Sequence, residues 1–135
     1  MQAAELLSIL GNPARPLLLA GDFNSAADGS STPTYANILA AGYTDVWSQA
    51  SPKEDGFTDA HDKDLLNTES KLSRRIDFIF ERDAFSSGTG RIPGLVRATV
   101  VGDEQADRTA SGLWPSDHGG IVARLLLPPP TLAGL

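Results

Sequence analysis

The sequence predicts an α/β protein of the α+β type, with short helices and short strands along one domain. The helices are predicted at residues 2–10 and 33–41, which contain good helix formers. The strands are predicted at residues 17–20, 76–80, 95–101 and 121–127, which are apolar or alternate between apolar and polar residues. A chain of 135 residues is long enough for one domain with a hydrophobic core and short for two.

The composition is that of a globular protein, with 41% hydrophobic and 21% charged residues. The net charge of −6 at pH 7 does not favour broad nucleic-acid binding, which relies on basic residues to neutralise phosphates. Local action on a nucleic-acid phosphate stays open if a metal ion supplies the positive charge. The absence of cysteine excludes disulfides and thiolate metal sites. We expect no membrane span, because no apolar run is long enough to cross a bilayer.

The first helix places Leu6, Leu7 and Leu10 on one side. This segment lacks the basic residues of a signal peptide and is interrupted by Glu5, so the localisation stays unknown. The strand at 17–20 follows, and Gly21 permits a sharp turn where that strand ends.

Two polar residues, Asp22 and Asn24, stand at the end of the strand at 17–20. Strand ends are where α/β sheets hold ligands, so these residues are candidates for a site. Both residue types are also favoured in a plain turn that binds nothing. This stretch alone leaves the two interpretations open.

The segment 33–50 predicts a helix followed by a short helical turn. Pro33 near the first turn and Gly42 after the last are typical of helix boundaries. Asp45 is a candidate N-cap for the next turn, which carries Trp47. We expect Trp47 to pack in the core, because a large aromatic side chain on a short helix usually does.

Residues 51–73 are predicted to form a long polar loop, a feature that is often functional in compact domains. His61 lies in it beside Asp59, Asp62 and Asp64. These residues match no known metal-ligand spacing, so the pattern favours a solvated loop face over a cation site.

The strand at 76–80 places Asp77 among apolar residues. A buried carboxylate is costly unless it is hydrogen-bonded or lies near a cation. One interpretation is an ion pair with Arg74 or Arg75. The other is that Asp77 orients a histidine or faces a metal ion.

The last informative stretch is 113–127, in which Asp117 and His118 lie between two turns and directly precede a strand. A histidine at the beginning of a strand is a candidate general acid or phosphate ligand. Segments 86–93 and 103–112 are predicted turn and loop regions. Prolines 128–130 end the last strand, and residues 128–135 form a proline-rich tail.

Three short motifs occur in order: GDFN at 21–24, RIDFIF at 75–80 and SDHGG at 116–120. Together they resemble the endonuclease/exonuclease/phosphatase superfamily, whose members include metal-dependent nucleases and phosphatases. The pieces GYTDVW at 42–47 and DLLNTESKLS at 64–73 resemble a branch with secreted bacterial members. The resemblance extends over residues 2–127, and it identifies residues 1–127 as similar to the C-terminal half of such a domain.

The resemblance implies a metal-dependent phosphoesterase that acts on a phosphate ester of unknown type. Asp22 would position or deprotonate the attacking water, and Asn24 would hydrogen-bond the phosphate. His118 would contact the scissile phosphate, and Asp77 would hold its imidazole in the right tautomer. Asp117 would lie near the metal, for which Mg²⁺ or Mn²⁺ is expected.

The same resemblance implies half of a four-layered α/β sandwich, with one mixed β-sheet and helices on one face. The half with a metal-binding glutamate has no counterpart in this sequence. We therefore expect an exposed apolar sheet face that pairs with a separate N-terminal half or with a second copy of this chain. The alternative function is a non-catalytic interaction module that retains a relic phosphoesterase site.

Overall fold

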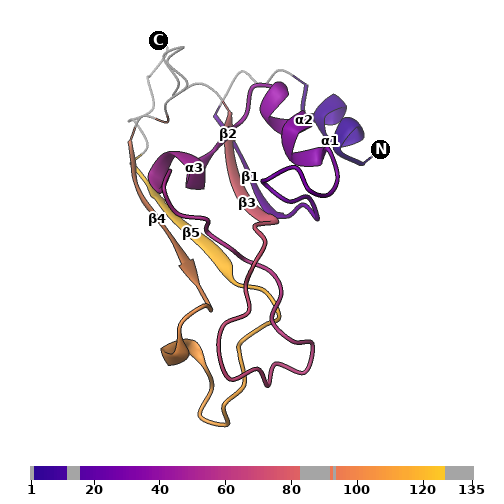
Figure 1. Cartoon of the computed structure of the whole chain (residues 1–135). Coiled ribbons are helices and arrows are strands. Elements are labelled where there is room, and N and C mark those ends of the chain that lie inside the picture. Colours follow the sequence, from indigo (N-terminus) through magenta and orange to yellow (C-terminus); the bar gives the residue numbers. More distant parts are fainter. Residues whose placement is uncertain (1, 12–15, 83–91, 93, 127–135) are drawn as a thin grey trace.

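The computed structural model describes residues 2–11, 16–82, 92 and 94–126 (Figure 1). Three helices are present among these residues, together with five strands and one short 3-10 helix. Their bounds are α1 Gln2–Leu10, β1 Leu17–Asp22, α2 Thr34–Ala40, β2 Thr44–Asp45, α3 Val46–Ala50, β3 Asp77–Arg82, β4 Leu95–Val101, η1 Gln105–Asp107 and β5 Gly120–Leu125.

The first sheet has the strand order β1-β3-β2, and both pairings are antiparallel. One face of β3 carries Phe78 and Phe80, which are buried with Ile38 of α2 and Tyr43. Leu7 and Leu10 of α1 pack against this cluster, as the apolar side predicted for the first helix requires. The helices α1 and α2 therefore cover the phenylalanine face of the sheet.

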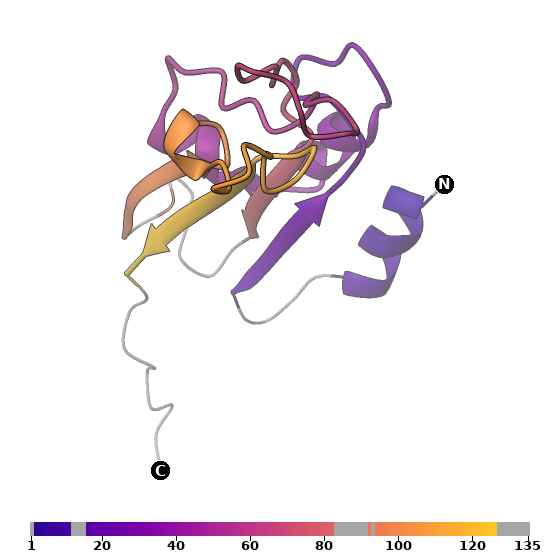
Figure 2. The same cartoon turned by 90° about the horizontal axis from the view of Figure 1, so that it is seen from below.

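The second sheet is the antiparallel pair β4-β5. Its inner face packs with Val46 and Trp47 of α3 in a second buried cluster. Figure 2 shows this sheet and α1 on opposite sides of the molecule, with β1 and β3 between them. Trp47 is 4% exposed, so its predicted place in the core is confirmed.

The short helix α3 begins at a buried cap. Asp45, 1% exposed, accepts a hydrogen bond from the Trp47 backbone N–H at 3.0 Å, which confirms the predicted N-cap. Its other oxygen accepts from Arg75 Nη1 at 2.5 Å and from the Tyr35 hydroxyl at 2.9 Å. This buried ion pair joins the cap of α3 to Arg75, which lies two residues before the start of β3.

The long loops at 51–73 and 102–119 lie side by side at one end of the molecule (Figure 1). Side chains join them: Trp114 Nε1 donates to the Asn67 backbone oxygen at 2.7 Å, and Gln105 Nε2 donates to the Thr68 backbone oxygen at 2.6 Å. Three residues of the first loop are buried, Thr58, His61 and Asn67. The loop thus packs as part of the molecule although it contains no helix or extended strand.

The predicted α+β class is confirmed, and the helix at 2–10 and the strand at 95–101 have the predicted bounds. The sheet arrangement differs from the expectation. The resemblance implies one mixed sheet, whereas the described strands form two separate sheets. Every pairing of neighbouring strands in them is antiparallel. The predicted turn at 86–93, apart from Ile92, and the tail at 128–135 lie outside the described residues.

Several large apolar side chains on the strands are exposed. Val101 and Val122 share one face of the second sheet, since Thr99 pairs with Val122 and Val101 with Gly120. Both are about half exposed, as is Leu18 on β1. Within the described part of the chain, no helix is long and apolar enough to cross a membrane.

Candidate functional site

Three candidate residues, one from each motif, lie near one another: Asp22, Asp77 and His118. The antiparallel register of β1 and β3 places Asp22 directly opposite Asp77. His118 precedes β5, and its Nδ1 lies 2.9 Å from Asp77 Oδ2. Because a carboxylate only accepts, Nδ1 carries the proton and Nε2 faces away from Asp77. The predicted contact between Asp77 and a histidine is therefore present.

Thr58 fixes the backbone that carries this pair. Its buried hydroxyl oxygen accepts from the backbone N–H groups of Ile76 and Asp77, at 3.2 and 3.1 Å. Its carbonyl accepts from Gly119 N–H at 2.8 Å. One residue of the long loop thus holds the start of β3 and the residue after His118 in place.

The imidazole of His118 lies between two carboxylates. Asp77 contacts Nδ1, and Asp59 Oδ1 lies 3.4 Å from Nε2. Burial of the ring lowers the pKa of His118, but the hydrogen bond to Asp77 and the charges of Asp77, Asp59 and Asp22 outweigh this effect. The pKa is therefore raised above its ordinary value of 6.5, and the site favours the imidazolium.

Asp59 corrects the expectation of a solvated loop face. Its backbone bridges Arg74 on one side and His118 on the other. Its carboxylate accepts a hydrogen bond from Arg74 Nη2, and its side chain is only 13% exposed. Neither alternative partner of Asp77 is used, because Arg74 pairs with Asp59 and Arg75 with Asp45.

His61 also differs from the expectation of a solvated loop. It is 5% exposed and stacks on Trp114 with ring centroids 4.2 Å apart. Its Nδ1 accepts from Asn67 Nδ2 at 2.9 Å, so Nε2 carries the proton and faces the Gly102 carbonyl at 3.3 Å. His61 therefore has a structural role in joining the two long loops.

Asp22 and Asn24 form a closed turn at the end of β1. Asp22 Oδ1 accepts from the Asn24 backbone N–H at 2.7 Å, and Oδ2 accepts from Asn24 Nδ2 at 2.9 Å. Asn24 has a φ of 48°, a left-handed conformation that asparagine tolerates better than most residues. The turn and the site interpretations of these residues are thus compatible.

Asp117 is exposed and lies 3.3 Å from the Ser116 hydroxyl. Among the described residues, no group of three or more histidine, aspartate or glutamate side chains is arranged to hold a metal ion. Asp22 and Asp117 offer oxygen donors that suit Mg²⁺, but they do not complete a site on their own. The described residues therefore do not by themselves form a complete divalent-metal site.

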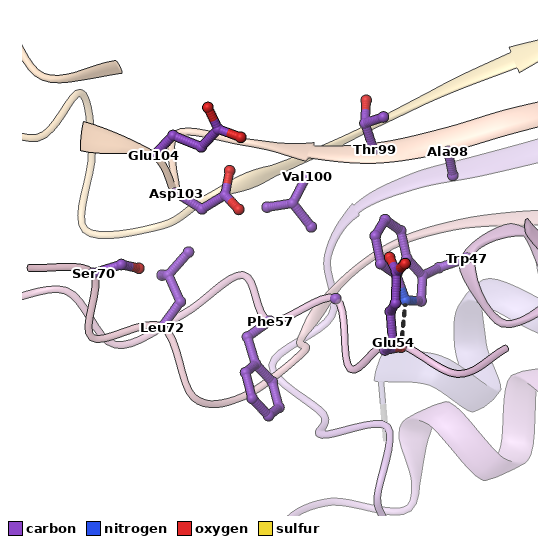
Figure 3. Close-up of a pocket in the computed structure, with 11 residues that line it drawn as sticks. Trp47, Glu54, Phe57, Ser70, Leu72, Ala98, Thr99, Val100, Asp103 and Glu104 are labelled. Atoms are coloured by element: carbon purple, nitrogen blue, oxygen red, sulfur yellow. Dashed lines mark hydrogen bonds between the residues drawn. The ribbon is translucent and has the colours of Figure 1, made fainter. Parts of the chain in front are cut away.

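Cavities lie near these elements, and one of about 560 Å³ between α1 and α2 has Asn24 in its wall. One of about 290 Å³ opens beside Asp22 and Asn24, with Ala3 and Leu6 of α1 in its wall. Another of about 470 Å³ lies between the loop at 51–73 and β4 (Figure 3). In Figure 3, Asp103 and Glu104 lie at the end opposite Trp47 and Glu54. None of the residues predicted for the site lines the cavity of about 470 Å³.

No family model matches the chain, and no curated protein matches it. Among solved structures, an endonuclease/exonuclease/phosphatase family protein from Leptotrichia buccalis C-1013-b is similar, with 24% identity and a TM-score of 0.60. The match covers 93% of this chain and 42% of that one. The comparison shows that the chain has the fold of part of such a protein, and it spans less than half of that protein's length.

Proposed function

We propose that this chain is part of a phosphoesterase, with its active site at Asp22, Asn24, Asp77 and His118. The observation that carries the proposal is the hydrogen bond between Asp77 Oδ2 and His118 Nδ1, opposite Asp22 in the strand register. The fold shared with the Leptotrichia protein supports the same class. The cavity beside Asp22 and Asn24 gives room for a ligand.

In this proposal, His118 binds the scissile phosphate through Nε2. Asp77 holds the proton on Nδ1 and favours the imidazolium, which stabilises the negative charge that builds on the phosphate oxygens. Asp22 positions or deprotonates the attacking water, and Asn24 hydrogen-bonds the phosphate. The substrate is a phosphate ester, and the acidic net charge does not favour long nucleic acids.

Phosphoryl transfer in this class would use Mg²⁺ or Mn²⁺ as a source of positive charge. Asp117 and Asp22 are the carboxylates that this chain offers to such an ion. Because they make no complete cluster with other described residues, the remaining ligands must come from outside the described residues. We expect the chain alone to bind Mg²⁺ weakly and to have little or no activity.

The metal ligands that the described residues do not supply and the exposed apolar side chains both suggest that a partner chain binds. We propose that a polypeptide equivalent to the rest of the Leptotrichia protein packs on the face that carries Val101 and Val122. A second copy of this chain is the other possible partner. Association of the chain with itself alone would favour that second copy.

A second candidate function is a non-catalytic module that retains a relic site. The observation that favours it is that both Asp22 oxygens are already engaged by Asn24. In a working site, Asp22 would bind the water or the metal ion through the lone pairs that these two hydrogen bonds leave.

Hydrolysis of bis(4-nitrophenyl) phosphate with Mg²⁺ or Mn²⁺ tests the proposal. The samples are the chain alone, the chain together with an N-terminal half, and the same combination with His118→Ala. We expect activity only with the N-terminal half, and His118→Ala is expected to lower it by a factor of about 100 or more. Full activity of the chain alone would contradict the incomplete site. Activity that is unaffected by His118→Ala would contradict the proposed residues.

A further inference from the structure

The Asp59 carboxylate contacts two groups that can carry positive charge, the guanidinium of Arg74 and the imidazole of His118. It accepts a hydrogen bond from Arg74 Nη2, and its Oδ1 lies 3.4 Å from His118 Nε2. Nε2 is the ring atom that Asp77 leaves for a ligand. The side chain of His118 is 28% exposed, so a small anion can approach it from solvent.

The backbone fixes Asp59 in this position. Thr58 and Asp59 donate their N–H groups to the Arg74 carbonyl at 2.7 and 3.0 Å, and Gly119 donates to the Thr58 carbonyl. Three segments of the chain therefore meet at Asp59. Its carboxylate is held between Arg74 and His118, and it cannot move away without a change of side-chain rotamer.

We propose that Asp59 is an internal competitor for the phosphate-binding position at His118, and that it determines which phosphate groups bind. The inference rests on the proposed function, because it takes the ligand of Nε2 to be a phosphate. A carboxylate and a phosphate oxygen seek the same cationic donors. A phosphate that reaches Nε2 displaces the Asp59 carboxylate and gains Arg74 as a second cationic partner. Weakly charged groups do not compete.

Asp59→Asn tests this competition with inorganic phosphate as the probe. The variant keeps the shape of the side chain and removes its charge. Phosphate is titrated into the full chain near pH 7 while the ring signals of His118 and the Nε–H signal of Arg74 are followed by NMR. We expect the dissociation constant of phosphate to fall by about fivefold or more, the factor that corresponds to an ion pair worth about 1 kcal/mol.

Asp22→Asn is the matched control. It removes a charge that also acts on His118, but Asp22 hydrogen-bonds Asn24 and makes no contact with Nε2 or Arg74 in the described structure. A smaller gain for Asp22→Asn than for Asp59→Asn supports competition. Equal gains would show a general electrostatic effect and would overturn the inference.

Arg74→Gln supplies a second, independent test. By itself it is expected to weaken phosphate binding, because it removes one cation and leaves Asp59 with His118 as its cationic partner. In the Asp59→Asn background it is expected to reduce the gain. Unchanged phosphate binding in Arg74→Gln would contradict the inference, even if Asp59→Asn does not fold.

If neither the wild type nor Asp59→Asn binds phosphate, the inference is wrong, because His118 and Arg74 would then bind no anion when Asp59 is removed. The hydrolysis assay separates this result from failure of the proposed function. Tighter phosphate binding by Asp59→Asn without any hydrolysis would retain the competition and reject the catalytic role.

Discussion

At the scale of single residues, the hydrogen bond between Asp77 and His118 determines the charge of the site. Because Asp77 helps to raise the pKa of His118, Asp77→Asn is expected to lower that pKa. A histidine with a raised pKa stabilises the fold below its ordinary value of 6.5, and this contribution is lost as the pH rises through the raised pKa. Asp77→Asn should therefore destabilise the protein more near about pH 5 than near about pH 9.

An NMR titration of the His118 ring measures the change of pKa, and urea unfolding at the two pH values measures the change of stability. Asp64→Asn is the control, since its carboxylate caps a turn at Leu66 within the loop. An unchanged His118 pKa in Asp77→Asn would contradict the assigned role of the hydrogen bond.

A carboxylate among apolar residues needs a partner, which left Arg74, Arg75 or a histidine as candidates for Asp77, and the family resemblance of the motifs implied His118. The sequence did not predict that Asp59 contacts Arg74 and His118. The contacts of Asp59 with Arg74 and His118 join residues far apart in the chain, and no local periodicity reports such contacts. His61 was assigned to the solvent for the same reason, since its burial depends on stacking with Trp114.

Gly56, within the long loop at 51–73, has a residue-scale role that can be tested by substitution. Gly56 has a φ of 66°, and an added Cβ would lie 2.2 Å from Trp47 Cε2. Gly56→Ala is therefore expected to lower the free energy of unfolding by about 2–4 kcal/mol, through backbone strain and overpacking together.

Gly29→Ala is the matched control for Gly56→Ala. Gly29 has a φ of 77°, but nothing lies within 4 Å of its added Cβ. It is expected to cost about 1 kcal/mol from backbone strain alone. Urea unfolding compares the two variants. Equal losses would mean that contact with Trp47 contributes nothing at position 56.

At the scale of secondary-structure elements, the buried pair of Asp45 and Arg75 connects α3 with β3. Asp45→Ala removes the helix cap and leaves the Arg75 guanidinium buried without its carboxylate. We expect a loss of about 3–5 kcal/mol in the free energy of unfolding. Asp62→Ala breaks the exposed pair with Lys71 and is expected to cost less than about 1 kcal/mol.

Urea unfolding monitored by the fluorescence of Trp47 and Trp114 distinguishes the two variants. A loss for Asp45→Ala as small as that for Asp62→Ala would show that Arg75 finds another partner when the carboxylate is removed. The prediction of the cap itself came from sequence, because an N-cap depends on residues only two positions apart.

The elements show where local reasoning is sufficient. The helix at 2–10, the cap at Asp45 and the strand at 95–101 follow from periodicity and capping within a few residues. The division into two antiparallel sheets does not. Strand pairing joins β1 to β3 across more than fifty residues, so direction and order depend on contacts that a single sequence pattern does not encode.

At the scale of the whole molecule, the fold covers one side of each sheet with described elements. The inner face of β4-β5 packs with α3, whereas Val101 and Val122 on the other face are about half exposed. Under the proposed function, a partner chain packs on this second face. Arg124 lies on the same side of β5 as Val122, so this face carries charge beside its two exposed valines, and the expected pairing through an apolar face stays a prediction.

Val122→Lys tests whether this face binds a partner. The lysine adds a charge at the centre of the proposed contact, so we expect it to weaken association with the N-terminal half, or with a second copy, on the order of tenfold or more. Because Val122 is 53% exposed in the chain alone, its replacement should change the free energy of unfolding by less than about 1 kcal/mol.

Leu66→Lys makes the same change at a side chain that is 58% exposed in the long loop. It is expected to leave association unchanged. Sedimentation velocity measures association, and urea unfolding measures stability. A wild-type chain that stays monomeric both alone and with the N-terminal half would reject the interface. Equal weakening by Leu66→Lys would show that added charge, wherever it lies, is responsible.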